Sequence, residues 1–366
     1  MHISPRLELS DVVTCYHGGL RLEEIEALGL SKEARSAIID FSVNTNPIGP
    51  SPAVKAALAD VDVQRYPDSE ATILREELSG RLGISASNLV VGNGSVELIW
   101  LTCLAYLAKG DTVLILGPTF GEYETASRIM GAHVIFYVAR EGDDYRPDLD
   151  EVGDTIGQVD AKLIFLCNPN NPTGCYLQKE EVERIISAAG KSLVVIDEAY
   201  ASLADSSWAS EELIRHPNVL LLRSMTKDLA LAGLRLGYAL ANDDVIDILR
   251  KVRPPWSANS FAQAAAIASL RDRDYLERSR LEIRTAKEYL VPRLKELGLT
   301  VIPSQANFLL MKVGDASTFR GKLLRKGFCL RDCSSFGLKD YVRIGIRTQT
   351  ECRDLAKAIR EVLEFD

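Results

Sequence analysis

Val219-Leu220-Leu221-Leu222-Arg223-Ser224-Met225-Thr226-Lys227 joins an apolar run to a lysine through a short polar loop. The apolar run predicts a buried strand, which places Lys227 just beyond the carboxyl end of that strand. Two earlier segments have the same design, because Leu193-Val194-Val195-Ile196 precedes Asp197 and a third apolar run precedes Asn171. In open α/β sheets, ligands bind beyond the carboxyl ends of the strands. We therefore expect these three polar side chains to share one site.

An amine, a carboxylate and an amide at one sheet edge suit pyridoxal 5′-phosphate (PLP). Lys227 would form a Schiff base with the aldehyde, Asp197 would keep the pyridine nitrogen protonated, and Asn171 would bond the ring hydroxyl. Each motif alone has a more ordinary explanation. A Ser-x-x-Lys segment is usually a solvated loop, and an Asp-Glu pair after a strand is often a helix cap. The three motifs together, in this order and each after a predicted strand, favour a PLP site over these explanations.

Length and composition set the broad class of the protein. The chain has 366 residues, which predicts one large domain and a smaller one. A formal charge of −8 and the absence of a basic stripe argue against nucleic acid as a partner. No apolar stretch reaches the roughly 18 residues of a membrane span. Residues 1–10 lack the apolar core of a signal peptide, so we expect a cytoplasmic protein without a membrane partner.

The cysteines do not indicate a disulfide framework. There are seven, with irregular spacing, and the four histidines are too scattered in the sequence to complete a zinc site. We expect reduced, mostly structural thiols and no metal.

Alternating strand and helix patterns fill the middle of the chain. Seven apolar runs predict strands, and helices are expected between them, for example over 95–107, 123–130, 179–189 and 243–251. This alternation predicts a mostly parallel seven-stranded sheet between helices. A long charged helix over 274–297 would lead to a small α+β domain. We expect an arm at residues 1–40, a large cofactor-binding domain at 41–250, and a linker helix with the small domain at 251–366. The seven strands are predicted at 89–91, 112–116, 133–138, 162–167, 193–196, 219–222 and 237–240.

Several residues are candidates for holding the cofactor. Gly94 and Ser95 lie in a glycine-rich turn between a strand and a helix, where free N–H groups and the helix dipole favour a phosphate. Ser224 lies three residues before Lys227 and would bond the same phosphate, and Arg235 would add a charge-assisted contact.

Three aromatic residues are candidates for contacts around the cofactor ring. Phe120 follows a strand end and would stack on the pyridine ring, although a core aromatic is an equally good interpretation. Tyr200 would donate to the ring oxygen. Tyr66 would reach a phosphate, in one arrangement from a second subunit.

These residues resemble fold-type I PLP enzymes, the aspartate aminotransferase superfamily, over essentially the whole chain. Two groups in it are most similar, L-threonine-O-3-phosphate decarboxylase and histidinol-phosphate aminotransferase. The first resemblance is carried by His17-Gly18-Gly19, by the segment 40–50, by Pro255-Trp256-Ser257-Ala258-Asn259, by Phe120, and by Arg347 where the aminotransferase typically has glycine.

The resemblance implies decarboxylation of L-threonine O-3-phosphate to (R)-1-aminopropan-2-yl phosphate and CO2, a step in cobalamin biosynthesis. A substrate with both a carboxylate and a phosphate needs several cations, and arginine suits both groups. The expected substrate-binding residues are His17, Gly18, Asn46, Arg331, Arg343 and Arg347.

The alternative is transamination of histidinol phosphate with 2-oxoglutarate. Either reading implies a small phosphorylated amino acid or amine as substrate and a homodimer. A third reading, a PLP-sensing domain of a transcription regulator, is disfavoured because the chain shows no helix-turn-helix extension.

Overall fold

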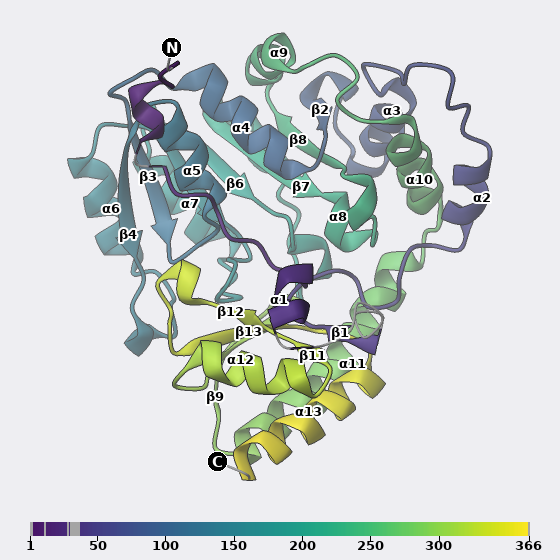
Figure 1. The fold of residues 1–366 in the computed structure, drawn as a ribbon. Coiled ribbons are helices and arrows are strands. Elements are labelled where there is room, and N and C mark those ends of the chain that lie inside the picture. Colours follow the sequence, from purple (N-terminus) through teal and green to yellow (C-terminus); the bar gives the residue numbers. More distant parts are fainter. Residues whose placement is uncertain (1–2, 11, 28, 30–36, 365–366) are drawn as a thin grey trace.

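The computed structural model describes residues 3–10, 12–27, 29 and 37–364. Its centre is a seven-stranded sheet in the order β2-β8-β7-β6-β5-β3-β4 (Figure 1). β8 alone runs opposite to the other six strands, so the predicted mostly parallel seven-stranded sheet is confirmed. The strands are β2 (Leu89–Gly92), β3 (Thr112–Gly117), β4 (His133–Val138), β5 (Ala161–Cys167), β6 (Leu193–Asp197), β7 (Val219–Ser224) and β8 (Gly237–Ala241).

Helices cover both faces of this sheet. Successive side chains of β3 alternate between two buried clusters, because Leu114 packs on one face and Ile115 on the other. The first face is covered by α2 (Ala53–Ala59), α3 (Thr72–Leu82), α6 (Leu149–Gln158), α7 (Lys179–Ala188) and α10 (Ser260–Arg271). The second is covered by α4 (Ser95–Tyr106), α5 (Glu122–Ile129) and α9 (Asp243–Val252).

A smaller α+β unit is built mainly from the C-terminal part of the chain. Its antiparallel sheet has the order β12-β13-β10-β9, and the long helix α11 packs against α13 beneath it (Figure 1). The strands are β9 (Thr300–Ile302), β10 (Phe308–Lys312), β12 (Arg331–Asp332) and β13 (Tyr341–Gly345). The helices are α11 (Tyr275–Glu296), α12 (Ala316–Arg325) and α13 (Gln349–Glu364).

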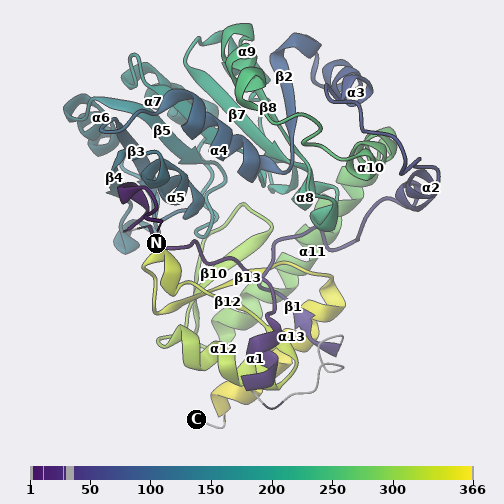
Figure 2. The same cartoon turned by 45° about the horizontal axis from the view of Figure 1, so that its top comes forward.

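The N-terminal segment joins this smaller unit. Strand β1 (Ile39–Asp40) pairs in parallel with β11 (Phe328–Cys329), and Phe41 is fully buried in the same core as α11 and α13. Short helix α1 (Leu22–Ala27) precedes it, and Figure 2 shows the segment before α1 passing between the two parts of the molecule. The domain boundaries at 40 and 250 stay a prediction.

Helix α6 was not predicted, because Gly153 and Gly157 interrupt its apolar pattern. Its start is set by Asp148, whose carboxylate accepts hydrogen bonds from the N–H groups of Asp150 and Glu151. Among the described residues, no helix combines the length and the apolar character that a membrane span requires.

Candidate active site

Three adjacent parallel strands carry the central polar groups to one edge of the sheet. Asp197 is the last residue of β6, Asn171 lies in the loop after β5, and the short helix α8 (Met225–Asp228) follows β7 and holds Lys227. All three residues line a cavity of about 580 Å³. The strand-end argument from sequence therefore placed these groups together correctly.

Asp197 is a buried carboxylate with two fixed hydrogen bonds. The Tyr123 hydroxyl donates to Oδ2 at 2.7 Å and the Ala199 N–H donates to Oδ1 at 3.0 Å. Burial raises the pKa of Asp197 to about 6, although the Tyr123 hydrogen bond lowers it. A cation beside this carboxylate, such as a protonated pyridine, would offset the cost of burying its charge.

Lys227 is half-buried and lines the same cavity. Burial, and after it the positive charges of Arg343 and Arg235, lower the pKa of its amine to about 8. The amine is therefore neutral in a much larger share of molecules at neutral pH than an exposed lysine would be. A neutral amine is the form that attacks an aldehyde.

A phosphate cradle lies beside Lys227. Ser95 begins α4, so free N–H groups and the positive end of the helix dipole face the cavity. The hydroxyls of Ser224 and Thr226 lie 2.6 Å apart, and Arg235 also lines the cavity. Among the described residues, Arg235 has no carboxylate partner. Its guanidinium donates one hydrogen bond, to the Ala232 carbonyl. This set of donors suits a dianionic phosphate.

Gly94 contributes to the cradle without lining the cavity. Its φ is +81°, and a Cβ there would come within 2.8 Å of Nη2 of Arg235. Only glycine therefore allows the backbone and Arg235 to approach each other in this way.

Two buried arginines form another wall of the cavity. Arg343 donates from Nη1 to Oδ1 of Asn171 and from Nη2 to the Ser42 carbonyl at 2.7 Å, while its buried Nε has no partner. Arg331 donates from Nη2 to the Tyr16 carbonyl and the Ser335 hydroxyl, both at 2.7 Å. Burial, and then the charge of Arg343, lower the pKa of Arg331. Within the described chain, neither arginine has an ion-pair partner, so this wall attracts anions.

Four further predicted residues line the same cavity. Phe120 follows β3, and the His17 ring lies 5.8 Å from the Phe120 ring between centroids. Gly18 packs so closely on the Ser42 carbonyl that a Cβ would come within 2.4 Å of its oxygen. Tyr200 is buried with its ring edge-on to Phe308, at a centroid distance of 4.9 Å.

Asn46 lies outside the cavity lining and has another task. Asn46 was expected to bind the substrate, but its backbone N–H donates to the Lys227 carbonyl at 3.1 Å and is not free to do so. Its side-chain Nδ2 donates to the Asp228 carbonyl at 2.8 Å and to the Ser279 hydroxyl at 2.7 Å. Asn46 thus fixes the turn that carries Lys227 against α11.

Tyr66 and Arg347 also lie away from the cavity. Tyr66 is 78% exposed and stacks on Trp256, with ring centroids 4.4 Å apart. Arg347 is ion-paired with Glu351 at 2.8 Å and contacts the Asp40 carbonyl. The guanidinium that was expected to bind a substrate carboxylate is therefore already paired within the protein.

Tyr123 and Asn44 were not among the predicted site residues. Tyr123 lies three residues after Phe120, and this short spacing after a strand end was the one available signal. Asn44 lies in the turn-rich segment that was singled out, but it was not selected. Both polar atoms of its buried side chain lack a partner, and it lines the cavity.

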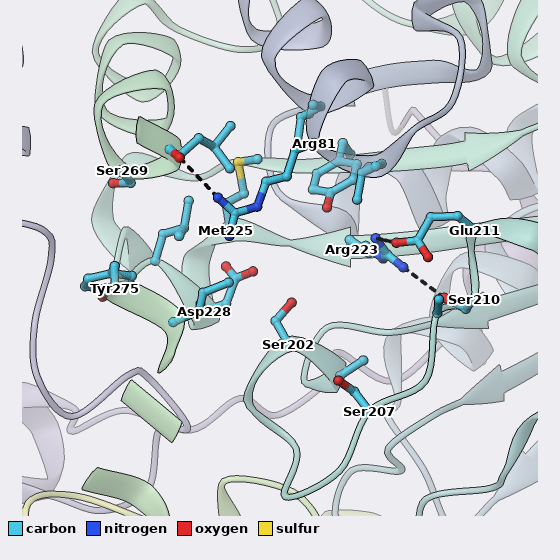
Figure 3. A pocket seen from close by; sticks show the side chains of 18 of the residues that line it. Arg81, Ser202, Ser207, Ser210, Glu211, Arg223, Met225, Asp228, Ser269 and Tyr275 are labelled. Atoms are coloured by element: carbon cyan, nitrogen blue, oxygen red, sulfur yellow. Dashed lines mark hydrogen bonds and ion pairs between the residues drawn. The ribbon is translucent and has the colours of Figure 1, made fainter. Parts of the chain in front are cut away.

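A second cavity, of about 370 Å³, is also lined by residues of α8, namely Met225 and Asp228 (Figure 3). Asp228 lines it, together with Arg223, which is held by Glu198, Glu211 and Ser210. Lys227 does not line this cavity, so the larger one is the candidate active site.

The donors of the larger cavity fit PLP. Lys227 would hold the aldehyde, Asp197 the pyridine nitrogen, and Ser95, Ser224, Thr226 and Arg235 the phosphate, while the unpartnered Asn44 amide adds polar capacity. When bound, PLP supplies an aldehyde that takes up a primary amine and a protonated ring that withdraws electrons. The fold and the site together define a PLP-dependent enzyme of the aminotransferase superfamily.

The chain belongs to the class I and II aminotransferases, whose family model matches residues 36–359. It is 36% identical to histidinol-phosphate aminotransferase 1 of Thiobacillus denitrificans, over 95% of this chain and 91% of that protein. The crystal structure of histidinol-phosphate aminotransferase from Sinorhizobium meliloti, in complex with PLP, has a TM-score of 0.85 and 27% identity, and covers 94% of this chain and 95% of that one. L-threonine-O-3-phosphate decarboxylase from Porphyromonas gingivalis has a TM-score of 0.78 and 27% identity, and covers 89% and 100% of the two chains.

These relatives overturn the expected decarboxylase function. Further curated relatives at 32 to 36% identity are also histidinol-phosphate aminotransferases. The expectation of threonine-phosphate decarboxylation in cobalamin biosynthesis is therefore wrong, and with it the assignment to the lyases. One physical reason is that Arg347, used to argue for a carboxylate on the substrate, is neutralised by Glu351 outside the cavity.

Proposed function

We propose that this protein transfers the amino group of histidinol phosphate to 2-oxoglutarate. The observation that carries the proposal is the 36% identity, over 95% of the chain, to a protein named for that activity. The substrate amine would reach Lys227, and the anionic groups would bind the wall formed by Arg331 and Arg343.

The charge of the cavity supports this reaction. A transaminase of this kind must accept a phosphate monoester and a dicarboxylate in turn at one site. Two buried guanidinium groups without ion-pair partners among the described residues can bind either anion, because arginine's planar fork matches both carboxylate and phosphate. The buried Nε of Arg343 is a donor that an anion would satisfy.

The test is a direct assay of the PLP-loaded protein with histidinol phosphate and 2-oxoglutarate. We expect stoichiometric glutamate, and no CO2 from L-threonine O-3-phosphate in a parallel reaction. Replacement of Arg343 by lysine, which keeps the charge but loses the fork, should raise KM for both substrates. An absence of glutamate with a spectrally competent, PLP-loaded protein would contradict the proposed reaction.

We also propose a homodimer in which Tyr66 reaches the partner subunit's cofactor phosphate. Support comes from the exposed Tyr66 and Trp256 stack, and from Val63, which is 72% exposed on the same loop. Mixing Lys227→Ala with Tyr66→Phe, which we expect to impair the site it contributes to, tests this arrangement. A mixed dimer would contain one site with both native residues, so activity should return on mixing. Mixtures that stay as inactive as the separate variants would contradict the shared site.

A further inference from the structure

The cavity wall contains a group of potential metal ligands that the proposed reaction does not use. Cys15, His17 and Glu122 each offer one ligand atom, and these atoms all lie within 4.8 Å of one another. Cys15 and His17 lie on the N-terminal segment, whereas Glu122 is the first residue of α5. This group could not be predicted from the sequence, because Glu122 lies 105 residues after His17.

Two of the three side chains are already aimed at each other. Nε2 of His17 lies 2.9 Å from Oε1 of Glu122, and the other carboxylate oxygen, Oε2, accepts a hydrogen bond from the Trp100 indole at 2.9 Å. The indole therefore fixes the orientation of the carboxylate and leaves Oε1 for another partner. Metal-binding carboxylates are commonly held by such an outer hydrogen bond.

The His17–Glu122 contact alone does not explain why the Cys15 thiol lies beside it. The Cys15 thiol packs against Gly121, where a Cβ would come within 2.9 Å of the sulfur. The thiol hydrogen-bonds the Glu122 carboxylate and also makes a long contact of 4.0 Å to the Tyr16 carbonyl. The absence of a side chain at position 121 thus lets the sulfur approach the start of α5 beside Glu122.

We propose that Cys15, His17 and Glu122 form a binding site for a divalent transition metal, Zn²⁺ in particular, on the wall of the active-site cavity. A thiolate, an imidazole and a carboxylate suit Zn²⁺ and do not suit Mg²⁺ or Ca²⁺. Ligands of tetrahedral Zn²⁺ lie roughly 3.3–3.8 Å apart, given bond lengths of about 2.0–2.3 Å. Side-chain shifts of about 1 Å bring the three atoms to these positions.

Three protein ligands leave a fourth coordination position. All three residues line the cavity, so this position takes water or an oxygen of a molecule in the cavity. The metal would also join the N-terminal segment to α5. Binding is measured without turnover, so the proposal stands or falls independently of the reaction proposed above.

The experiment uses untagged, full-length, PLP-loaded protein that has been stripped with a chelator. Equilibrium dialysis against Zn²⁺, followed by elemental analysis, should give one Zn²⁺ per chain. Co²⁺ in its place should give a thiolate-to-metal charge-transfer band. The matched control is Cys175→Ser, which removes another partly buried thiol beside Arg146 and should bind like the wild type.

Three variants test the ligands and their support. Cys15→Ser should abolish the Co²⁺ charge-transfer band, and His17→Gln should weaken Zn²⁺ binding by more than about tenfold. Trp100→Phe keeps a ring but removes the donor to Glu122, so binding should weaken by about 10- to 100-fold. The His17 side chain is 52% exposed, so His17→Gln decides the matter if Cys15→Ser fails to fold. Wild-type protein that takes up no Zn²⁺, or a folded His17→Gln variant with unchanged affinity, would overturn the site.

Discussion

The Tyr123 hydroxyl donates a 2.7 Å hydrogen bond to the Asp197 carboxylate, and both side chains are fully enclosed by the protein. Tyr123 is in turn stacked on Phe165 of β5, with ring centroids 4.8 Å apart. The tyrosine therefore has one available orientation, and it holds the carboxylate that would face the pyridine nitrogen. Helix α5 thus fixes a group at the end of β6.

Replacing Tyr123 by phenylalanine should change the titration of Asp197. Its pKa is already raised to about 6 by burial, and the hydroxyl lowers it, so Tyr123→Phe should raise it further. The carboxylate would then protonate at a higher pH, and kcat should fall by roughly 10- to 100-fold, since a hydrogen bond to a charged group contributes about 1.5–3 kcal/mol. Carboxyl ¹³C shifts of cofactor-free protein report the midpoint. Tyr137→Phe, outside the active-site cavity, is the control. An unchanged Asp197 midpoint would show that the hydrogen bond has no electrostatic effect.

Replacing Lys227 by alanine should abolish both turnover and covalent attachment of PLP. Borohydride reduction of the wild type should leave PLP on the peptide that contains Lys227, and mass spectrometry of Lys227→Ala should find none. Lys191→Ala removes an exposed lysine and should behave as the wild type. Trapped PLP at another lysine of the Lys227→Ala protein would remove Lys227 from its proposed role.

PLP uptake by the cofactor-free protein should depend on pH through Lys227. Because the pKa of the amine is lowered to about 8, the reactive neutral form should be nearly complete by about pH 9. Below pH 8 the uptake rate should fall about tenfold per pH unit, and above about pH 9 it should level off. An ordinary lysine would instead show a rate that continues to rise through about pH 10. Stopped-flow absorbance across pH 6 to about 10 distinguishes the two profiles.

Removing the Asn46 side chain should loosen the turn that carries Lys227. Asn46→Ala deletes the donor to the Asp228 carbonyl, and a buried polar group left without a partner costs about 1–3 kcal/mol. We expect a loss of that size in urea unfolding, together with slower PLP uptake. Asn88→Ala, which removes an exposed bond to Asp243, should cost much less. Wild-type uptake in Asn46→Ala would mean that Lys227 is positioned without this contact.

The sequence predicted what depends on local pattern. Apolar runs and strand ends located the seven-stranded sheet and brought Lys227, Asp197 and Asn171 to one edge, because strand direction in such a sheet determines where the ends meet. Side chains whose task depends on distant packing were missed. The role of Tyr123 depends on its hydrogen bond to Asp197, and the role of Asn44 depends on its place in the cavity wall.

The prediction that Arg347 binds the substrate failed for a different reason. The charge of Arg347 was assigned to the substrate, although Glu351 lies four residues later, at a spacing typical of ion pairs near a helix start. That spacing was visible in the sequence. The choice between two similar families rested on such single positions, and comparison over the whole chain reversed it.

The contact of Asn46 with both the Lys227 turn and Ser279 has a consequence for how the protein becomes active during synthesis. Lys227 leaves the ribosome about fifty residues before Ser279, and more than a hundred before Arg343. The nascent chain therefore contains its reactive lysine well before the segments that brace it and complete the cavity. Productive capture of PLP would come late in translation, after the last helices have formed.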